Sequence, residues 1–109
     1  MRSEVKLMAT RNVRQTHTEM LKDLDVASEY LNEALEGDDP AVVLMALRNI
    51  AEAQEDGISG LAERASLGRE SMYKMLSSSG NPKLSSFVKL MHGLGLKIQV
   101  QPDAAHASR

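Results

Sequence analysis

The chain has 109 residues, of which 42% are apolar and 26% are charged, and its formal net charge at pH 7 is −2. This length and composition predict one globular domain with a modest core. Because the chain has no cysteine, disulfides and thiolate metal sites are excluded, which fits a reducing cytoplasm. The longest apolar run, residues 41–47, is too short to span a bilayer, and the N-terminus lacks a signal-peptide core. We therefore expect a soluble, cytoplasmic protein that has no membrane partner.

Residues 1–24 are expected to form an N-terminal extension that is partly helical. Apolar spacing favours a helix over residues 18–24. Residues 5–7 alternate between apolar and polar types, which is a weak indication of a short strand.

Two helices are predicted in the acidic part of the chain. Asp25 is the expected N-cap of the first helix and Gly37 its end. Asp39 and Pro40 open the second, because a carboxylate satisfies free amides and proline suits a first helical turn. Apolar stripes at helical spacing are Tyr30, Leu31, Ala34 and Leu35, and then Val43, Leu47, Ile50 and Ala51. These stripes are expected to face the core.

Residues 61–76 have the pattern of two short helices joined by a tight turn, as in a DNA-reading helix-turn-helix. We expect helices over residues 58–64 and 69–77, with Ala62 at the closest crossing, where a larger side chain would push the helices apart. Inward-facing residues are predicted to be Leu61, Leu67, Met72 and Met75.

The residues left on the outside of the second helix are predicted to contact DNA, because the start of such a helix reaches base edges in the major groove. They are Gly68, Arg69, Glu70, Ser71, Tyr73 and Lys74. Arg69 can bind guanine through two hydrogen bonds, and Glu70 can accept one from cytosine or orient Arg69. Ser71 can donate to a phosphate. Tyr73 has a second possible role, which is packing beneath the following loop.

Three further residues are predicted to contact the DNA backbone. Ser59 begins the first helix of the motif, where free amides can bind a phosphate. Asn81 and Lys83 lie in the polar loop after the second helix. Asn81 either contacts a phosphate or caps the next helix.

A last helix is expected over residues 84–93 and a strand after it. The inward face of the helix is Phe87, Leu90, Met91 and Leu94. Leu96, Ile98 and Val100 then alternate with polar residues, which is strand periodicity. A lone strand needs a partner, and three remain open: residues 5–7, the same strand of a second copy, or another protein. We expect residues 96–109 to hold this strand and a disordered tail.

Charge is divided unevenly along the chain. Residues 1–56 hold six Lys/Arg and twelve Asp/Glu, a net charge of −6, whereas residues 57–98 hold six Lys/Arg and two Asp/Glu, a net charge of +4. The positive half suits DNA phosphates and the acidic half suits a basic protein partner. The alternative is that both are solvated faces with no partner.

The run from about residue 20 to residue 102 resembles the addiction-module antidote family, antitoxins with a helix-turn-helix of the lambda-repressor/Cro (XRE) type. The matching motifs, in order, are YLNEAL at residues 30–35, DDPAVVLMALRNIAEA at 38–53, LAERASLGRESMY at 61–73, GNPKLSS at 80–86 and HGLGLKI at 92–98. One position departs from the family pattern, because Ser66 stands in the turn where the family usually has glycine. A left-handed backbone there would cost serine about 1 kcal/mol relative to glycine.

The pattern and the resemblance together predict an all-α protein. It would be a five-helix, lambda-repressor-like helix-turn-helix domain over residues 25–95, with the N-terminal extension and a short C-terminal β-strand. The resemblance implies neutralisation of a small RelE/ParE-like toxin and repression of the shared operon through double-stranded operator DNA. A homodimer is expected, because dimers read two half-sites about 34 Å apart. The alternative is a protein-interaction module that keeps this fold without reading DNA.

No catalytic, metal or cofactor site is predicted, so the protein is not expected to be an enzyme. The three histidines are far apart, without metal-ligand spacing. Gly93 and Gly95 follow a helix and precede a strand, the reverse of a phosphate-binding fingerprint, and are read as structural. Ser71 and His92 lack the orienting acid and local motif of a nucleophilic pair.

Overall fold

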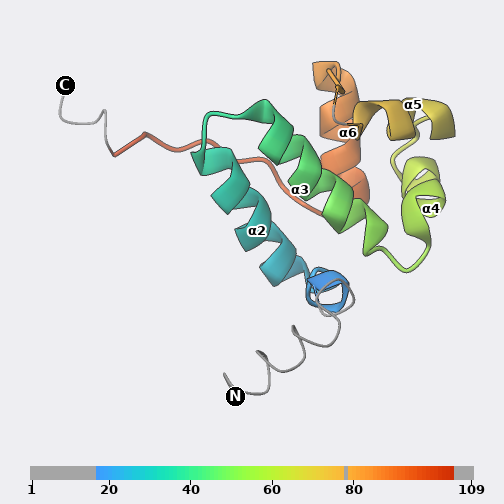
Figure 1. Cartoon of the computed structure of the whole chain (residues 1–109), viewed down its shortest axis with the longest axis horizontal. Helices are drawn as coiled ribbons and strands as arrows, with labels where there is room; N and C mark the ends of the chain where they lie inside the picture. The colour runs from blue at the N-terminus through green and yellow to red at the C-terminus, as the bar shows by residue number, and fades with distance from the viewer. Residues whose placement is uncertain (1–16, 78, 105–109) are drawn as a thin grey trace.

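The computed structural model of the chain describes residues 17–77 and 79–104, and their regular structure is helical (Figure 1). The expected strand at residues 5–7 lies outside the described residues. The helices are α2 (Leu24–Glu36), α3 (Pro40–Glu52), α4 (Gly57–Arg64), α5 (Arg69–Met75) and α6 (Leu84–Leu94), and a helical turn at residues 17–20 precedes them. None of the helices in the described ranges is long and apolar enough to cross a membrane.

Side-chain caps fix the starts of the first two long helices. Asp23 caps α2, because its carboxylate accepts from the amides of Asp25 at 2.8 Å and Val26 at 3.4 Å. The prediction of Asp25 as the cap is therefore wrong by two residues, and Asp25 instead sits in the first turn. The prediction for α3 is confirmed, with Asp39 accepting from the Ala41 amide at 3.0 Å.

Helix α3 is the centre of the arrangement, with α2 packed on one side and α4 on the other (Figure 1). The largest fully buried side chains come from four helices and are Leu47, Ile50, Leu61, Met72 and Leu90. No polar side chain is buried among the described residues. The predicted stripes hold except at Leu35, which is 50% exposed because it lies at the last turn of α2, where the core no longer covers the helix.

The segment before α2 belongs to the same core. Leu21 is 2% exposed and joins the main apolar cluster. The ring of His17 meets the ring of Tyr30 edge-on at a centroid distance of 5.1 Å, and the Tyr30 hydroxyl accepts from the Asn49 amide at 2.8 Å. Tyr30 therefore ties the first helical turn, α2 and α3 together.

Helix α6 ends at Leu94 and is followed by Gly95, whose φ of 80° lies in the left-handed region that favours glycine. The next amide, of Leu96, donates to the Met91 carbonyl at 2.9 Å, which completes a Schellman cap. The Leu96 side chain packs against the core, whereas Ile98 and Val100 are exposed. The predicted C-terminal strand is not seen in the described residues, because strand structure requires a hydrogen-bonded neighbour and none lies beside this segment there.

Candidate nucleic-acid interface

The turn between α4 and α5 is built on a left-handed residue. Ser66 has a φ of 57°, and it is the only residue besides glycine with positive φ in the described ranges. Its amide donates to the Glu63 carbonyl at 3.1 Å, and the Leu67 amide donates to the Ala62 carbonyl at 2.8 Å. These two bonds form a Schellman cap, so the strain predicted for a serine at this position is present in the turn.

The inward face of the α4–α5 pair is as predicted. Leu61, Ala62, Met72 and Met75 are all buried, and Leu67 is partly buried against the core. Ala62 is 2% exposed, which agrees with a place at the helix crossing. Helix α5 ends at Met75, two residues before the predicted end.

The outward face of α5 presents every residue predicted for it. Gly68, Arg69, Glu70, Ser71, Tyr73 and Lys74 are all exposed. Tyr73 is 50% exposed and is not among the residues packed on the core, which favours its role on the surface over packing beneath the loop. Arg69 and Lys74 form no ion pair with any residue that the structure describes. The charges of Arg69 and Lys74 therefore stay available to an anionic partner.

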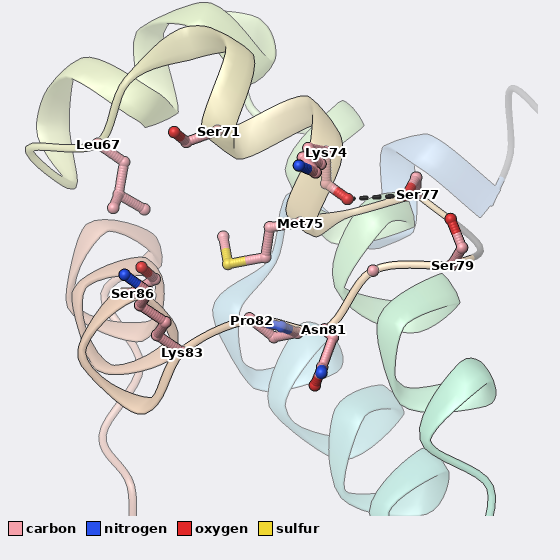
Figure 2. A pocket seen from close by; sticks show the side chains of 11 residues that line it. Leu67, Ser71, Lys74, Met75, Ser77, Ser79, Asn81, Pro82, Lys83 and Ser86 are labelled. Carbon is pink, nitrogen blue, oxygen red and sulfur yellow. Dashed lines mark hydrogen bonds between the residues drawn. The ribbon is translucent and has the colours of Figure 1, made fainter.

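A hollow of about 370 Å³ separates α5 from the start of α6 (Figure 2). It brings together four of the predicted DNA-binding residues, which are Ser71, Lys74, Asn81 and Lys83. The predicted DNA contacts do not include three serines that share its wall, which are Ser77, Ser79 and Ser86. The run of serines at residues 77–79 is the signal in the sequence, but by itself it indicates only a polar loop. Hydroxyl and ammonium groups around one hollow are suited to phosphate oxygens.

The loop residue Asn81 does not cap α6. The N-cap position is Lys83, and no side chain of the described residues caps the free amides of this helix. The Asn81 side chain is exposed and is directed away from α5 (Figure 2). Of the two roles considered for Asn81, only a surface contact remains.

Ser59 lies apart from the hollow, exposed in the first turn of α4. Asp56 occupies the N-cap position of that helix but makes no cap bond. Its carboxylate instead accepts two hydrogen bonds from Arg64, from Nε at 2.9 Å and from Nη2 at 2.8 Å. The side-chain hydrogen bonds from Arg64 hold the pKa of Asp56 below its ordinary value, and the same bonds raise the pKa of Arg64.

Arg64 also donates to the Gly93 carbonyl and to the Gln54 side chain, the latter at 3.2 Å. It therefore connects the loop before α4 to the end of α6. Its charge, counted in the positive half of the sequence, is neutralised by Asp56. The other cations of the positive half form no ion pair with a described residue, and they are Arg69, Lys74, Lys83, Lys89 and Lys97.

No group of three or more His, Asp or Glu side chains in the described ranges is arranged to hold a metal ion. The arrangement of α5 and the hollow can bind an anion by charge and hydrogen bonding.

Residues 13–102 match the family model described as "Probable addiction module antidote protein". The chain belongs to this family. A relative from Haemophilus influenzae, described as "Uncharacterized protein", is 42% identical over 93 residues, which cover 77% of this chain and 94% of the relative. No solved structure matches. Membership of the antidote family indicates an antitoxin role and therefore a toxin partner.

Proposed function

We propose that this antidote-family protein is a cytoplasmic antitoxin that binds its own operator as a homodimer, represses the operon, and neutralises a small RelE/ParE-like toxin. The function is one of binding and not of catalysis. The observation that carries the DNA-binding part is the outward face of α5, where Arg69, Tyr73 and Lys74 are exposed and the two cations form no ion pair with a described residue.

In this proposal α5 is the reading helix of a lambda-repressor-like motif. Arg69 is the first residue of α5 and is placed to contact a guanine edge, with Glu70 and Tyr73 beside it. Lys74, Lys83 and the hydroxyls of Ser71, Ser79 and Ser86 bind phosphates, which fix the register of the helix in the groove. Ser59 adds a phosphate contact from α4.

The toxin is proposed to bind the acidic half of the chain. Helices α2 and α3 and the turn between them carry exposed carboxylates at Glu29, Glu33, Glu36, Asp38 and Glu52. A small RNA-cleaving toxin is basic, so opposite charges would steer the two proteins together.

The DNA-binding part is tested by titrating the protein against the DNA upstream of its own gene and against a scrambled duplex of equal length. Binding that is at least about 1,000-fold tighter to the upstream DNA supports sequence-specific reading. Equal affinity for both duplexes would favour the alternative of a protein-interaction module. The antitoxin part is tested by co-expression with a small basic protein encoded beside this gene, where co-purification and rescue of growth are expected.

A further inference from the structure

The segment that follows α6 carries a row of unused backbone groups. Leu96 donates its amide to the Met91 carbonyl, but no backbone hydrogen bond within the described ranges involves residues 97–101. Figure 1 shows this segment leaving α6 and passing the end of α2 as an extended trace. Val100 is 94% exposed and Ile98 is 43% exposed. β-branched residues on a free edge are a template for strand pairing.

We propose that residues 97–101 pair in antiparallel fashion with residues 97–101 of a second copy, around a two-fold axis at Gln99. This inference rests on the proposed homodimer and names the segment that holds it together. Two neighbours limit the paired length. The Leu96 amide is already bonded, and Pro102 has no amide to donate.

The symmetric register places apolar residues opposite apolar residues and polar residues opposite polar residues. With Gln99 on the axis, Ile98 of one copy lies opposite Val100 of the other, so both apolar pairs form on one face of the ribbon. Lys97 lies opposite Gln101, on the other face. The two Lys97 side chains are therefore at opposite ends of the ribbon and do not repel each other closely.

Charge complementarity supports the second copy as the occupant. Gln99, Val100 and Gln101 line a hollow of about 590 Å³ together with Asn32 and Glu36 of α2. Because Lys97 of the second copy lies opposite Gln101 in this register, its ammonium group approaches the Glu36 carboxylate. Glu36 forms no ion pair with a described residue of its own chain.

The main test is the oligomeric state of the full chain by sedimentation equilibrium at micromolar concentration. The wild type is expected to be a dimer, and the double variant Ile98→Pro/Gln99→Pro a monomer, with the dissociation constant raised at least about tenfold. In an antiparallel ladder, every second residue donates its backbone amide to the partner strand. Changing two consecutive positions therefore removes one donated amide, whichever set of residues donates. The matched control is Ile98→Val/Gln99→Thr, which keeps strand propensity and should stay dimeric. Helical circular dichroism should be equal in all three.

The register has its own test. Lys97→Glu and Glu36→Lys should each weaken the dimer, roughly threefold, and the two together should restore wild-type affinity. Because the chain has no cysteine, Gln99→Cys adds a single thiol that should form an intersubunit disulfide on mild oxidation, while Val42→Cys on α3 should not.

The outcomes separate this inference from the proposed function. A wild-type monomer would overturn the inference together with the proposed dimer. A double-proline variant that remains dimeric would overturn the inference alone. If residues 97–101 become protected from solvent only when a toxin is bound, the segment belongs to the toxin interface, and this result would overturn self-pairing. Arg69→Ala, which alters the DNA surface, should leave the dimer unchanged.

Discussion

Arg64 grips Asp56 through two hydrogen bonds of 2.9 and 2.8 Å and reaches the Gly93 carbonyl with its remaining nitrogen. One side chain thus joins the loop before α4, α4 itself and the C-terminal end of α6. The pair lies at the surface, with about half of each side chain accessible to water, at 42% and 46%. The pair therefore contributes modestly to the free energy of unfolding, and its main effect is to fix the positions of the elements that it joins.

This pair makes stability depend on acid pH. The folded-state pKa of Asp56 lies below its ordinary value of 3.8, so the pair stabilises the fold above that pH and is lost as pH falls through the lowered pKa. Asp56→Asn should lower the melting temperature by a few degrees at pH 7. This gap between the melting temperatures of the wild type and the variant should close as the pH drops below 3.8, the ordinary pKa of the carboxyl group. Calorimetry across this range is the measurement. Asp38→Asn, which alters an exposed carboxylate on the α2–α3 turn, should show a much smaller gap at pH 7, and equal gaps would contradict the prediction.

Arg69→Ala should cost about 1–3 kcal/mol of specific DNA binding, because the proposed bidentate contact to guanine would be lost. Fluorescence anisotropy with labelled operator measures the loss. The matched control is Arg48→Ala, which removes an exposed arginine of α3 that pairs with Glu52 of the same helix, away from α5. Unchanged operator affinity in Arg69→Ala would remove this residue from base reading.

Lys74→Ala and Lys83→Ala should each lower the affinity of the protein for operator DNA and for scrambled DNA by similar factors. Both ammonium groups border the hollow, and phosphate contacts carry no base sequence. The slope of log affinity against log salt should fall by about 1 for each lost contact. Lys22→Ala, on the acidic side beside Glu19, is the control. A salt slope equal to that of the wild type would show that the hollow does not bind the DNA backbone.

Gly93→Ala should destabilise the fold by about 1–3 kcal/mol through overpacking. A Cβ atom at this position would lie 2.8 Å from the Cβ of Ala65 and 3.2 Å from its Cα, where α6 crosses the end of α4. Chemical denaturation measures the change. At Gly37 the added Cβ would meet only a carbonyl oxygen at 3.7 Å, so Gly37→Ala should be nearly neutral. If both variants were equally stable, the close approach would not limit packing.

Ser66→Gly should stabilise the protein by about 0.5–1 kcal/mol. The φ of 57° at this position strains a side chain but not glycine. Ser66→Ala keeps the Cβ and should bring no gain in thermal unfolding experiments. A glycine variant no more stable than the alanine variant would mean that the turn relaxes the strain.

The local signals in the sequence predicted local structure well. Pro40 after Asp39 placed the start of α3, and the departure at Ser66 anticipated the left-handed turn. The α2 cap was misplaced because Asp23 and Asp25 are equally good caps in sequence, and only the turn at residues 21–23 selects the first. Apolar and polar residues do alternate after Gly95, but a β-ladder also needs a second strand. No described segment forms backbone hydrogen bonds with residues 97–101.

Contacts between residues that lie far apart in the chain could not be predicted from the sequence. The charge count along the sequence does not show that Arg64 is paired, because its partners lie 8 and 29 residues away. The hollow depends on how far the loop after α5 brings Ser79 toward Ser86 of α6, which no spacing rule predicts. Side chains on one helix face follow from periodicity, whereas surfaces formed by two elements follow from tertiary packing.

The Arg64 connection has a consequence for recognition. Since α4 is fastened to α6 on one side and carries α5 on the other, the orientation of α5 is established in the free protein. The proposed association with a duplex would then require little reorganisation of the backbone, and the entropy lost on binding would come mainly from exposed side chains such as that of Arg69. The complex would accordingly form by rigid docking, with affinity set by the fit between α5 and its groove.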